Sequence, residues 1–227
     1  IIRTAYTDAG FLDASVKKAG FIYNEVKREV TILVDIEEGP RYKVSSVTAE
    51  GMTYFTATEL DEITRDLPGR TFKGPRLAKA TGKVKTLYGN QGYIDTEVTY
   101  RLDKTVDQRT VHIRLDVKES PVVYVGNIRL DREDYNYEVD VNALNRFINW
   151  LVPPVKDKVI LKEVRLKSGD KFRTSNEVRT VERLRNLELF RKVEVKKEPT
   201  ADPKVRDAII SVEENPNAAF VGVSAGI

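Results

Sequence analysis

Cysteine is absent from the 227 residues, and histidine occurs once, at His112. Without a thiol the chain has no thiolate zinc site, no cysteine nucleophile and no disulfide scaffold. The lack of thiols suits an oxidising compartment, although many proteins of reducing compartments also lack cysteine. His112 occupies a polar position of an alternating segment, so we do not expect it to bind a metal or to act in catalysis. We therefore predict that the chain is not an enzyme and holds no cofactor or metal.

Long apolar runs are also missing, since none approaches the ~18 residues that a membrane-spanning helix needs. The charges nearly cancel, with 38 Lys and Arg against 35 Asp and Glu and a net charge of +3. No concentrated basic stripe is evident, because glutamates interrupt the Lys- and Arg-rich stretch 183–197, and we expect no nucleic-acid partner. The opening residues 1–4 are typical of the interior of an element and not of a signal peptide. The length favours two or three small domains.

A repeat is present along the chain. Residues 4–11 (TAYTDAGF) resemble residues 86–93 (TLYGNQGY), and both follow the pattern Thr-x-Tyr-x-x-x-Gly-aromatic. A third copy has Leu189-Phe190 in place of Gly-aromatic. In each copy two alternating segments follow, and these end in an acidic residue close to a proline. The similar spacing of these features predicts tandem domains. The closing prolines are Pro40, Pro121 and Pro216.

Secondary structure can be predicted from the same copies. Segments 67–72 and 166–172 share Gly-x-x-Phe, and the first copy has no counterpart. Strict alternation at 111–117 predicts a strand with one buried face. Segments 58–63 and 77–88 have helical spacing, and we expect the first helix to begin at Thr58 and the second to end at Gly89 or Gly92. Each complete copy therefore predicts the order β-α-α-β-β, an α+β fold whose three-stranded mixed sheet is covered on one face by two helices.

Together these features resemble POTRA domains, in particular those of BamA-like outer-membrane protein assembly factors. The resemblance rests on the Tyr-x-x-x-Gly-aromatic pattern, the paired alternating strands, the exit Glu38-Gly39-Pro40 and the pair Gly126-Asn127 after a first strand. It covers nearly the whole chain. It implies four segments: 1–40, the C-terminal part of a truncated domain; 41–120, a complete domain; 121–216, the barrel-proximal domain; and 217–227, the beginning of the first β-barrel strand.

An insertion follows Asn127 in the last copy. It predicts a helix near 140–152 with a broad apolar side that includes Phe147, Trp150 and Leu151. A face of this width needs a cover. The helix either packs within its own domain or docks on the barrel, a partner lipoprotein or the membrane surface.

The resemblance implies a periplasmic scaffold of a cell outer-membrane protein. Such a scaffold receives unfolded outer-membrane proteins and passes them to its own C-terminal β-barrel. The open edge of a three-stranded sheet can accept an extended peptide as an added strand. We expect this edge at the second strand of each sheet. The residues concerned are Thr96, Val98 and Tyr100 in the middle copy and Val193 and Val195 in the last.

Several alternatives stay open. Lys192, Glu194 and Lys196 could serve only to guard the edge against aggregation. The resemblance implies that Glu182 contacts an accessory outer-membrane lipoprotein, whereas an ordinary surface role suits any charged helix face. The whole chain could instead belong to a related outer-membrane protein-secretion transporter, or form a free-standing periplasmic interaction module.

Overall fold

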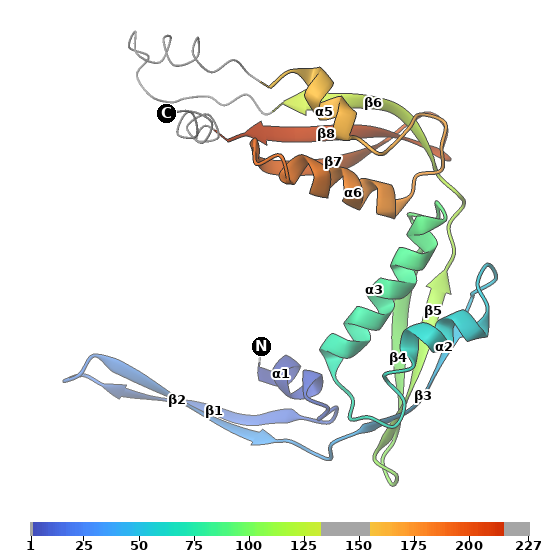
Figure 1. The fold of residues 1–227 in the computed structure, drawn as a ribbon. Coiled ribbons are helices and arrows are strands. Elements are labelled where there is room, and N and C mark those ends of the chain that lie inside the picture. Colours follow the sequence, from blue (N-terminus) through green and yellow to red (C-terminus); the bar gives the residue numbers. More distant parts are fainter. Residues whose placement is uncertain (1, 133–154, 216–227) are drawn as a thin grey trace, which may run out of the picture. The chain divides into compact units, whose positions relative to one another are not determined.

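The computed structural model describes residues 2–132 and 155–215, which form two compact units (Figure 1). One unit consists of Ile1–Lys85 with Thr96–Glu119, and the other of Thr86–Asp95 with Ser120–Ile227. The helix expected at 140–152, which contains Phe147, Trp150 and Leu151, and the strand expected at 217–227 lie outside the described residues. Within the described residues, no helix is both long enough and apolar enough to cross a membrane.

The first unit begins with a helix and a two-stranded antiparallel sheet. The elements are α1 (Ile2–Asp8), β1 (Ser15–Asn24) and β2 (Glu29–Glu37). Large apolar side chains of this ribbon, such as Phe21, Tyr23 and Ile32, are exposed. A two-stranded ribbon buries little apolar surface by itself, so these side chains contribute little to stability as they stand.

The same unit contains a three-stranded mixed sheet. Its elements are β3 (Lys43–Glu50), α2 (Ala57–Thr64), α3 (Gly74–Asn90), β4 (Glu97–Thr105) and β5 (Thr110–Lys118). The strand order is β3-β5-β4, in which β5 runs parallel to β3 and antiparallel to β4. The apolar positions of the alternating segment 111–117 are buried, as are Leu77, Val84 and Tyr88 of α3. Each such side chain contributes about 1.5–3 kcal/mol on burial, so the predicted alternation supplies the core of this sheet.

The ends of the two helices differ in detail from the prediction. Thr56, not Thr58, caps α2, because its hydroxyl accepts from the backbone of Glu59 while the Glu59 carboxylate accepts from the backbone of Thr56. This reciprocal arrangement is a capping box. α3 ends at Asn90, so Gly89 lies inside the helix, and the turn that follows contains Gly92 with a φ of 96°. Only glycine adopts such a φ without strain.

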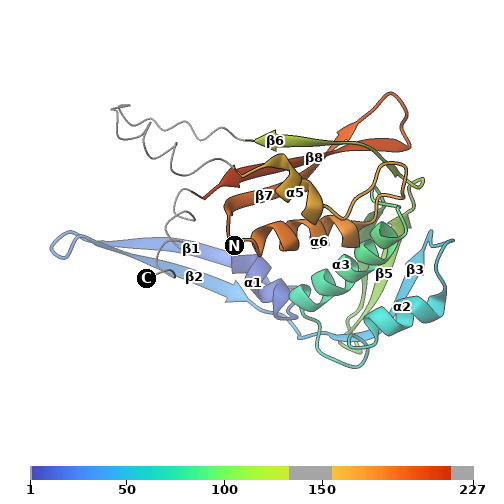
Figure 2. The same ribbon diagram turned by 45° about the horizontal axis from the view of Figure 1, so that its top comes forward.

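The second unit repeats the three-stranded arrangement. Its elements are β6 (Tyr124–Arg132), α5 (Asp157–Glu163), α6 (Thr174–Arg185), β7 (Phe190–Pro199) and β8 (Val205–Glu214). The order is β6-β8-β7, with β6 and β8 parallel. Helices α5 and α6 lie along the sheet (Figure 2), and their Ile160 and Leu184 belong to the same buried core as Ile210 of the central strand. The predicted fold class, mixed three-stranded sheets with paired helices, is confirmed.

The motif Gly-x-x-Phe forms the same turn in both sheets. Gly69 has a φ of 75° and donates its N–H to the carbonyl oxygen of Val44 at 2.8 Å. Gly169 has a φ of 85° and donates to Val125 at 2.8 Å. The turn thus ties the segment before the second helix to the first strand, and the sequence match between the copies is a match in structure. The aromatic residues of the motif, both buried, are Phe72 and Phe172.

Candidate functional site

The free edge of β4 is the first candidate site. β4 pairs with β5 from Glu97 opposite Lys118 to Thr105 opposite Thr110, and none of the described residues pairs with its other side. In an antiparallel edge strand, alternate residues direct their N–H and C=O groups away from the sheet. This edge can therefore form a ladder with an added strand.

The side chains along β4 extend the core towards this edge. Val98 and Leu102 are half-buried and Tyr100 is 50% exposed, and all three are opposite buried residues of β5. A strand added beside β4 would place its own side chains next to this strip. Thr96 is different, because it precedes β4 and is only 5% exposed, so it does not belong to the edge.

The edge of β7 offers backbone groups without such a strip. Val193 and Val195 are 3% and 8% exposed and belong to the core of their own domain. Their side chains are therefore not available to a partner. On the opposite face Lys196 extends across the sheet to Asp131, with 3.3 Å between Nζ and Oδ2. This charge is directed over the sheet and not towards the edge, which weighs against a purely guarding role for Lys196.

The open face of the sheet β3-β5-β4 carries paired charges. Arg101 donates to Asp116, with 2.7 Å between Nε and Oδ2, and to Glu50 at 3.1 Å. The hydrogen bond from Arg101 holds the pKa of the Asp116 carboxyl below its ordinary value. A shallow depression of about 340 Å³ at the end of this face is lined by these two carboxylates together with Glu97 and Lys118. These carboxylates have cationic partners, so we do not assign a general acid–base pair to this depression.

His112 lies on the same open face. Its Nδ1 is 2.7 Å from the hydroxyl oxygen of Ser46 and its Nε2 is 3.0 Å from that of Thr48. Both ring nitrogens thus have hydroxyl partners. Across residues 2–132 and 155–215, no three His, Asp or Glu side chains are grouped so that they could hold a metal ion.

The glutamates at the end of each sheet have a structural role that the sequence interpretation missed. Glu119 Oε1 accepts the backbone N–H of Thr53 at 2.8 Å and of Tyr54 at 3.0 Å. Glu214 likewise accepts the N–H of Val155, with N–O distances of 3.2 and 3.4 Å. The signal was present in the sequence, since a glutamate stands just before the closing proline in every copy.

A second repeated contact is formed by the acidic residue two positions after the aromatic residue of the Gly-aromatic pattern, which we call the marker (Phe11 and Tyr93). Tyr42 donates its hydroxyl to Asp13 Oδ2 at 2.5 Å, and Lys104 forms an ion pair with the same carboxylate. The hydrogen bonds from Lys104 and Tyr42 lower the pKa of Asp13, and the bond to Asp13 raises the pKa of Tyr42 to about 12. In the second unit Asp95 pairs with Arg206 at 3.2 Å. These contacts anchor the segment that follows each marker.

The glycines of the Gly-aromatic pattern, Gly10 and Gly92, bond to the residue just before the first strand of the next copy. Gly10 and Gly92 have φ values of 102° and 96°, and their carbonyl oxygens accept the N–H of Tyr42 at 2.9 Å and of Val123 at 2.8 Å. In the third copy the carbonyl of Leu189 accepts an N–H from the exit segment at 2.8 Å. The repeat in sequence therefore marks a repeated backbone contact.

Glu182, the candidate contact for a lipoprotein, is exposed on α6. No ion pair among the described residues includes it, whereas the adjacent Arg183 donates to Glu163 at 2.6 Å. The carboxylate is therefore available to a partner. The third group of expected contact residues, on the helix near 140–152, lies outside the described residues.

Comparison with known proteins agrees with this architecture. Residues 42–120 match the POTRA family, described as a surface antigen variable number repeat. The outer membrane protein assembly factor BamA of Neisseria meningitidis is 24% identical over 126 residues, 55% of this chain and 16% of that protein. Its counterpart in Nitratidesulfovibrio vulgaris is 22% identical over 231 residues, 96% of this chain and 26% of that protein. The chain thus spans about a quarter or less of these curated relatives.

Two solved structures share the fold. The crystal structure of Haemophilus influenzae BamA POTRA3-5 has a TM-score of 0.75 at 21% identity and covers 94% of this chain and 77% of that one. BamA of Haemophilus ducreyi without POTRA domains 1-3 has a TM-score of 0.60 at 21% identity, over 77% of this chain and 30% of that one. The repeated sheets and the family match define a region of POTRA domains. Because the chain is also similar to these BamA proteins, this region is a BamA-like POTRA region.

Proposed function

We propose that this chain is the periplasmic part of an outer-membrane assembly factor and that it binds unfolded outer-membrane β-barrel proteins as added strands. The observation that carries this proposal is the free edge of β4 with its partly exposed strip of Val98, Tyr100 and Leu102. Backbone pairing depends little on side-chain identity, which suits a receptor for many clients. The edge of β7 supplies a second ladder through its backbone alone.

The proposal includes partners and domain limits. Residues 41–120 and 121–216 are two complete POTRA domains, 1–40 is the later part of another, and 217–227 opens the β-barrel to which the client passes. An accessory lipoprotein binds α6 at Glu182, where the carboxylate has no ion pair in the described residues. In this scheme the chain works as a scaffold and catalyses no reaction.

The test is a titration of the isotope-labelled chain with an extended peptide. A peptide of about ten residues spans an edge strand at roughly 3.3 Å per residue, and its apolar residues alternate and end in an aromatic residue. We expect amide shifts and slowed hydrogen exchange within Glu97–Thr105. The same peptide with N-methyl groups on alternate residues cannot complete the ladder, so it should not bind. Equal binding of both peptides, or shifts confined to loops, would contradict strand addition.

A pair of variants separates the edges. Tyr100→Ser removes the exposed aromatic of the β4 strip and should weaken the peptide about fivefold, as expected for a cross-strand contact of about 1 kcal/mol. Tyr124→Ser is the matched control, because Tyr124 is an exposed aromatic on the edge strand β6. A larger loss in the control would move the site to β6.

A further inference from the structure

The second helix of the middle domain lies in a segment without acidic residues. Between Asp66 and Asp95 the sequence contains no Asp or Glu, although acidic residues make up 35 of the 227 in the chain. Since the net charge of the whole chain is only +3, we expected no concentrated basic stripe, and that expectation was wrong for this segment. Its cations are Arg70, Lys73, Arg76, Lys79, Lys83 and Lys85.

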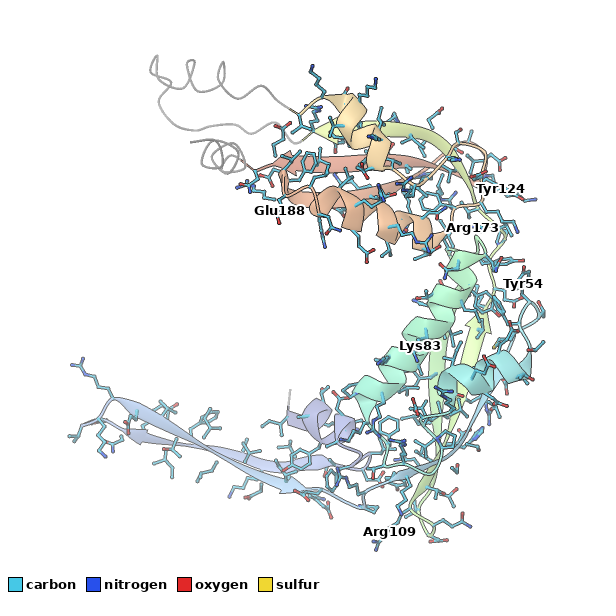
Figure 3. All side chains as sticks on the ribbon, viewed as in Figure 1. Tyr54, Lys83, Arg109, Tyr124, Arg173 and Glu188 are labelled. Atoms are coloured by element: carbon cyan, nitrogen blue, oxygen red, sulfur yellow. The ribbon has the colours of Figure 1, made fainter. Side chains whose placement is uncertain are left out.

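The structure places most of these cations on one element. Lys79, Lys83 and Lys85 are exposed on α3, and Arg76 is half-buried in its first turns (Lys83 is labelled in Figure 3). None of the ion pairs recorded for residues 2–132 and 155–215 includes any of these four. The helix therefore presents a set of like charges without counter-charges, which is unfavourable for the folded chain alone.

The equivalent helix of the last domain differs. On α6, Arg183 donates to Glu163 at 2.6 Å and Glu177 pairs with Lys197 at 2.9 Å. Arg183, at the position of the fold that Lys83 occupies, is thus neutralised within the chain. α6 also carries two acidic residues, Glu177 and Glu182, whereas α3 carries none. An unpaired basic face is complementary to an acidic partner.

The centre of this helix face is formed by small residues and therefore lies below the surrounding lysine side chains. At about 100° per residue, Ala78 and Gly82 lie between Lys79 and Lys83 on one side and Lys85 on the other. Both small residues are exposed, and a Cβ added at Gly82 would meet no atom within 4 Å. Glycine destabilises a helix relative to alanine, although the space at Gly82 would admit a Cβ. Small residues let the ridge of another helix approach closely.

We propose that the exposed side of α3 binds an acidic helical segment of a partner protein. Lys79, Lys83 and Lys85 pair with carboxylates of that segment, and its backbone passes over Ala78 and Gly82. A helix fits better than a membrane surface, because the face carries no large apolar side chain that could enter a bilayer. This surface is separate from the strand edge of β4.

The probe is a helical peptide of about 20 residues built from Ala and Glu, with its Lys-for-Glu counterpart as a negative control. Binding to the 227-residue chain is followed by fluorescence anisotropy. Lys79→Glu with Lys83→Glu should weaken binding by about tenfold or more, since two attractive pairs become repulsive. The matched control is Lys158→Glu with Lys162→Glu, which makes the same charge change with the same spacing on α5, and it should alter Kd by less than about twofold.

A second variant tests close packing without changing charge. Gly82→Leu fills the low centre of the face and should also weaken the peptide, while far-UV circular dichroism stays that of the parent. Three results would overturn the proposal. These are equal loss in the α5 control, unchanged affinity of Gly82→Leu, and preferential binding to anionic phospholipid vesicles that is lost in the α3 double variant. The last outcome would assign the face to a membrane surface.

Discussion

The side-chain oxygen of Asn90, at the end of α3, accepts a hydrogen bond from the backbone N–H of Ser175 at 2.9 Å. Ser175 belongs to the first turn of α6, where N–H groups have no acceptor within the helix. The N-cap residue of α6, Arg173, provides no side-chain acceptor of its own. One helix thus caps another.

Replacing this cap should destabilise the second unit. We expect Asn90→Ala to lower the free energy of unfolding by about 1 kcal/mol, the usual value for a lost N-cap. Asn90→Asp keeps the acceptor and adds a negative charge at a helix N-terminus, so it should restore stability. Urea denaturation followed by circular dichroism measures both. Equal losses in the two variants would show that Asn90 acts through packing and not as a cap.

Glu119 should contribute more to the free energy of unfolding than an exposed glutamate of the same sheet. Glu119→Gln weakens the acceptor for the N–H groups of Thr53 and Tyr54, and we expect a loss of about 1–2 kcal/mol. Glu97→Gln is the control, because Glu97 is exposed and forms only a long ion pair of 3.7 Å with Lys118. Its replacement should lower the free energy of unfolding by less than about 0.5 kcal/mol. Similar denaturation midpoints for the two variants would contradict the assigned role.

Asp13 predicts a stability that falls in acid. Its folded pKa is lowered from the ordinary 3.8, so the ionised form stabilises the fold above that pH, and the contribution is lost as pH falls through the folded value. Asp13→Asn should therefore cost about 1–3 kcal/mol at pH 7, and the cost should shrink as pH falls below 3.8 towards the lowered folded pKa. Urea titrations at several pH values test this. A difference between variant and parent that does not change with pH would exclude the ionised carboxylate as its source.

The marker glycine and the helix glycine should respond in opposite directions to alanine. Gly92→Ala forces a residue with a Cβ into a φ of 96° and places that Cβ 3.0 Å from Val122, so we expect a loss of about 1–3 kcal/mol. Gly82→Ala lies in a helix with open space around it and should gain about 0.5–1 kcal/mol. Thermal unfolding of both variants gives the comparison. Gains in both would show that the turn tolerates a side chain.

The sequence predicted what is local. Alternation at 111–117 gave a half-buried strand, and the repeat of Gly-x-x-Phe gave a repeated turn. The start of α2 was misplaced by two residues, because a cap is identified by its partner three residues on, Glu59, and not by residue type alone. The burial of Val193 and Val195 depends on packing in a core shared with Leu184 of α6, which periodicity alone does not reveal.

Charge was the least predictable property. The near-balance of the whole chain hid the basic side of α3, because an average over 227 residues says nothing about one helix face. The acceptor role of Glu119 was not predicted, because it depends on a loop far away along the chain. The pairing of Glu119 with Thr53 crosses 66 residues and has no local signature.

The central strand of each three-stranded sheet is the last of its sheet in the chain. Lys43 pairs with Thr110 and Tyr124 with Val205, so each first strand waits for a partner that follows much later. A chain made from its N-terminus therefore cannot close either sheet until β5 or β8 has emerged. Until then β3 and β4, or β6 and β7, have no neighbour within their own sheet. Each sheet should thus form in one late step, and its unfinished strands are open to chaperones and proteases in the interval.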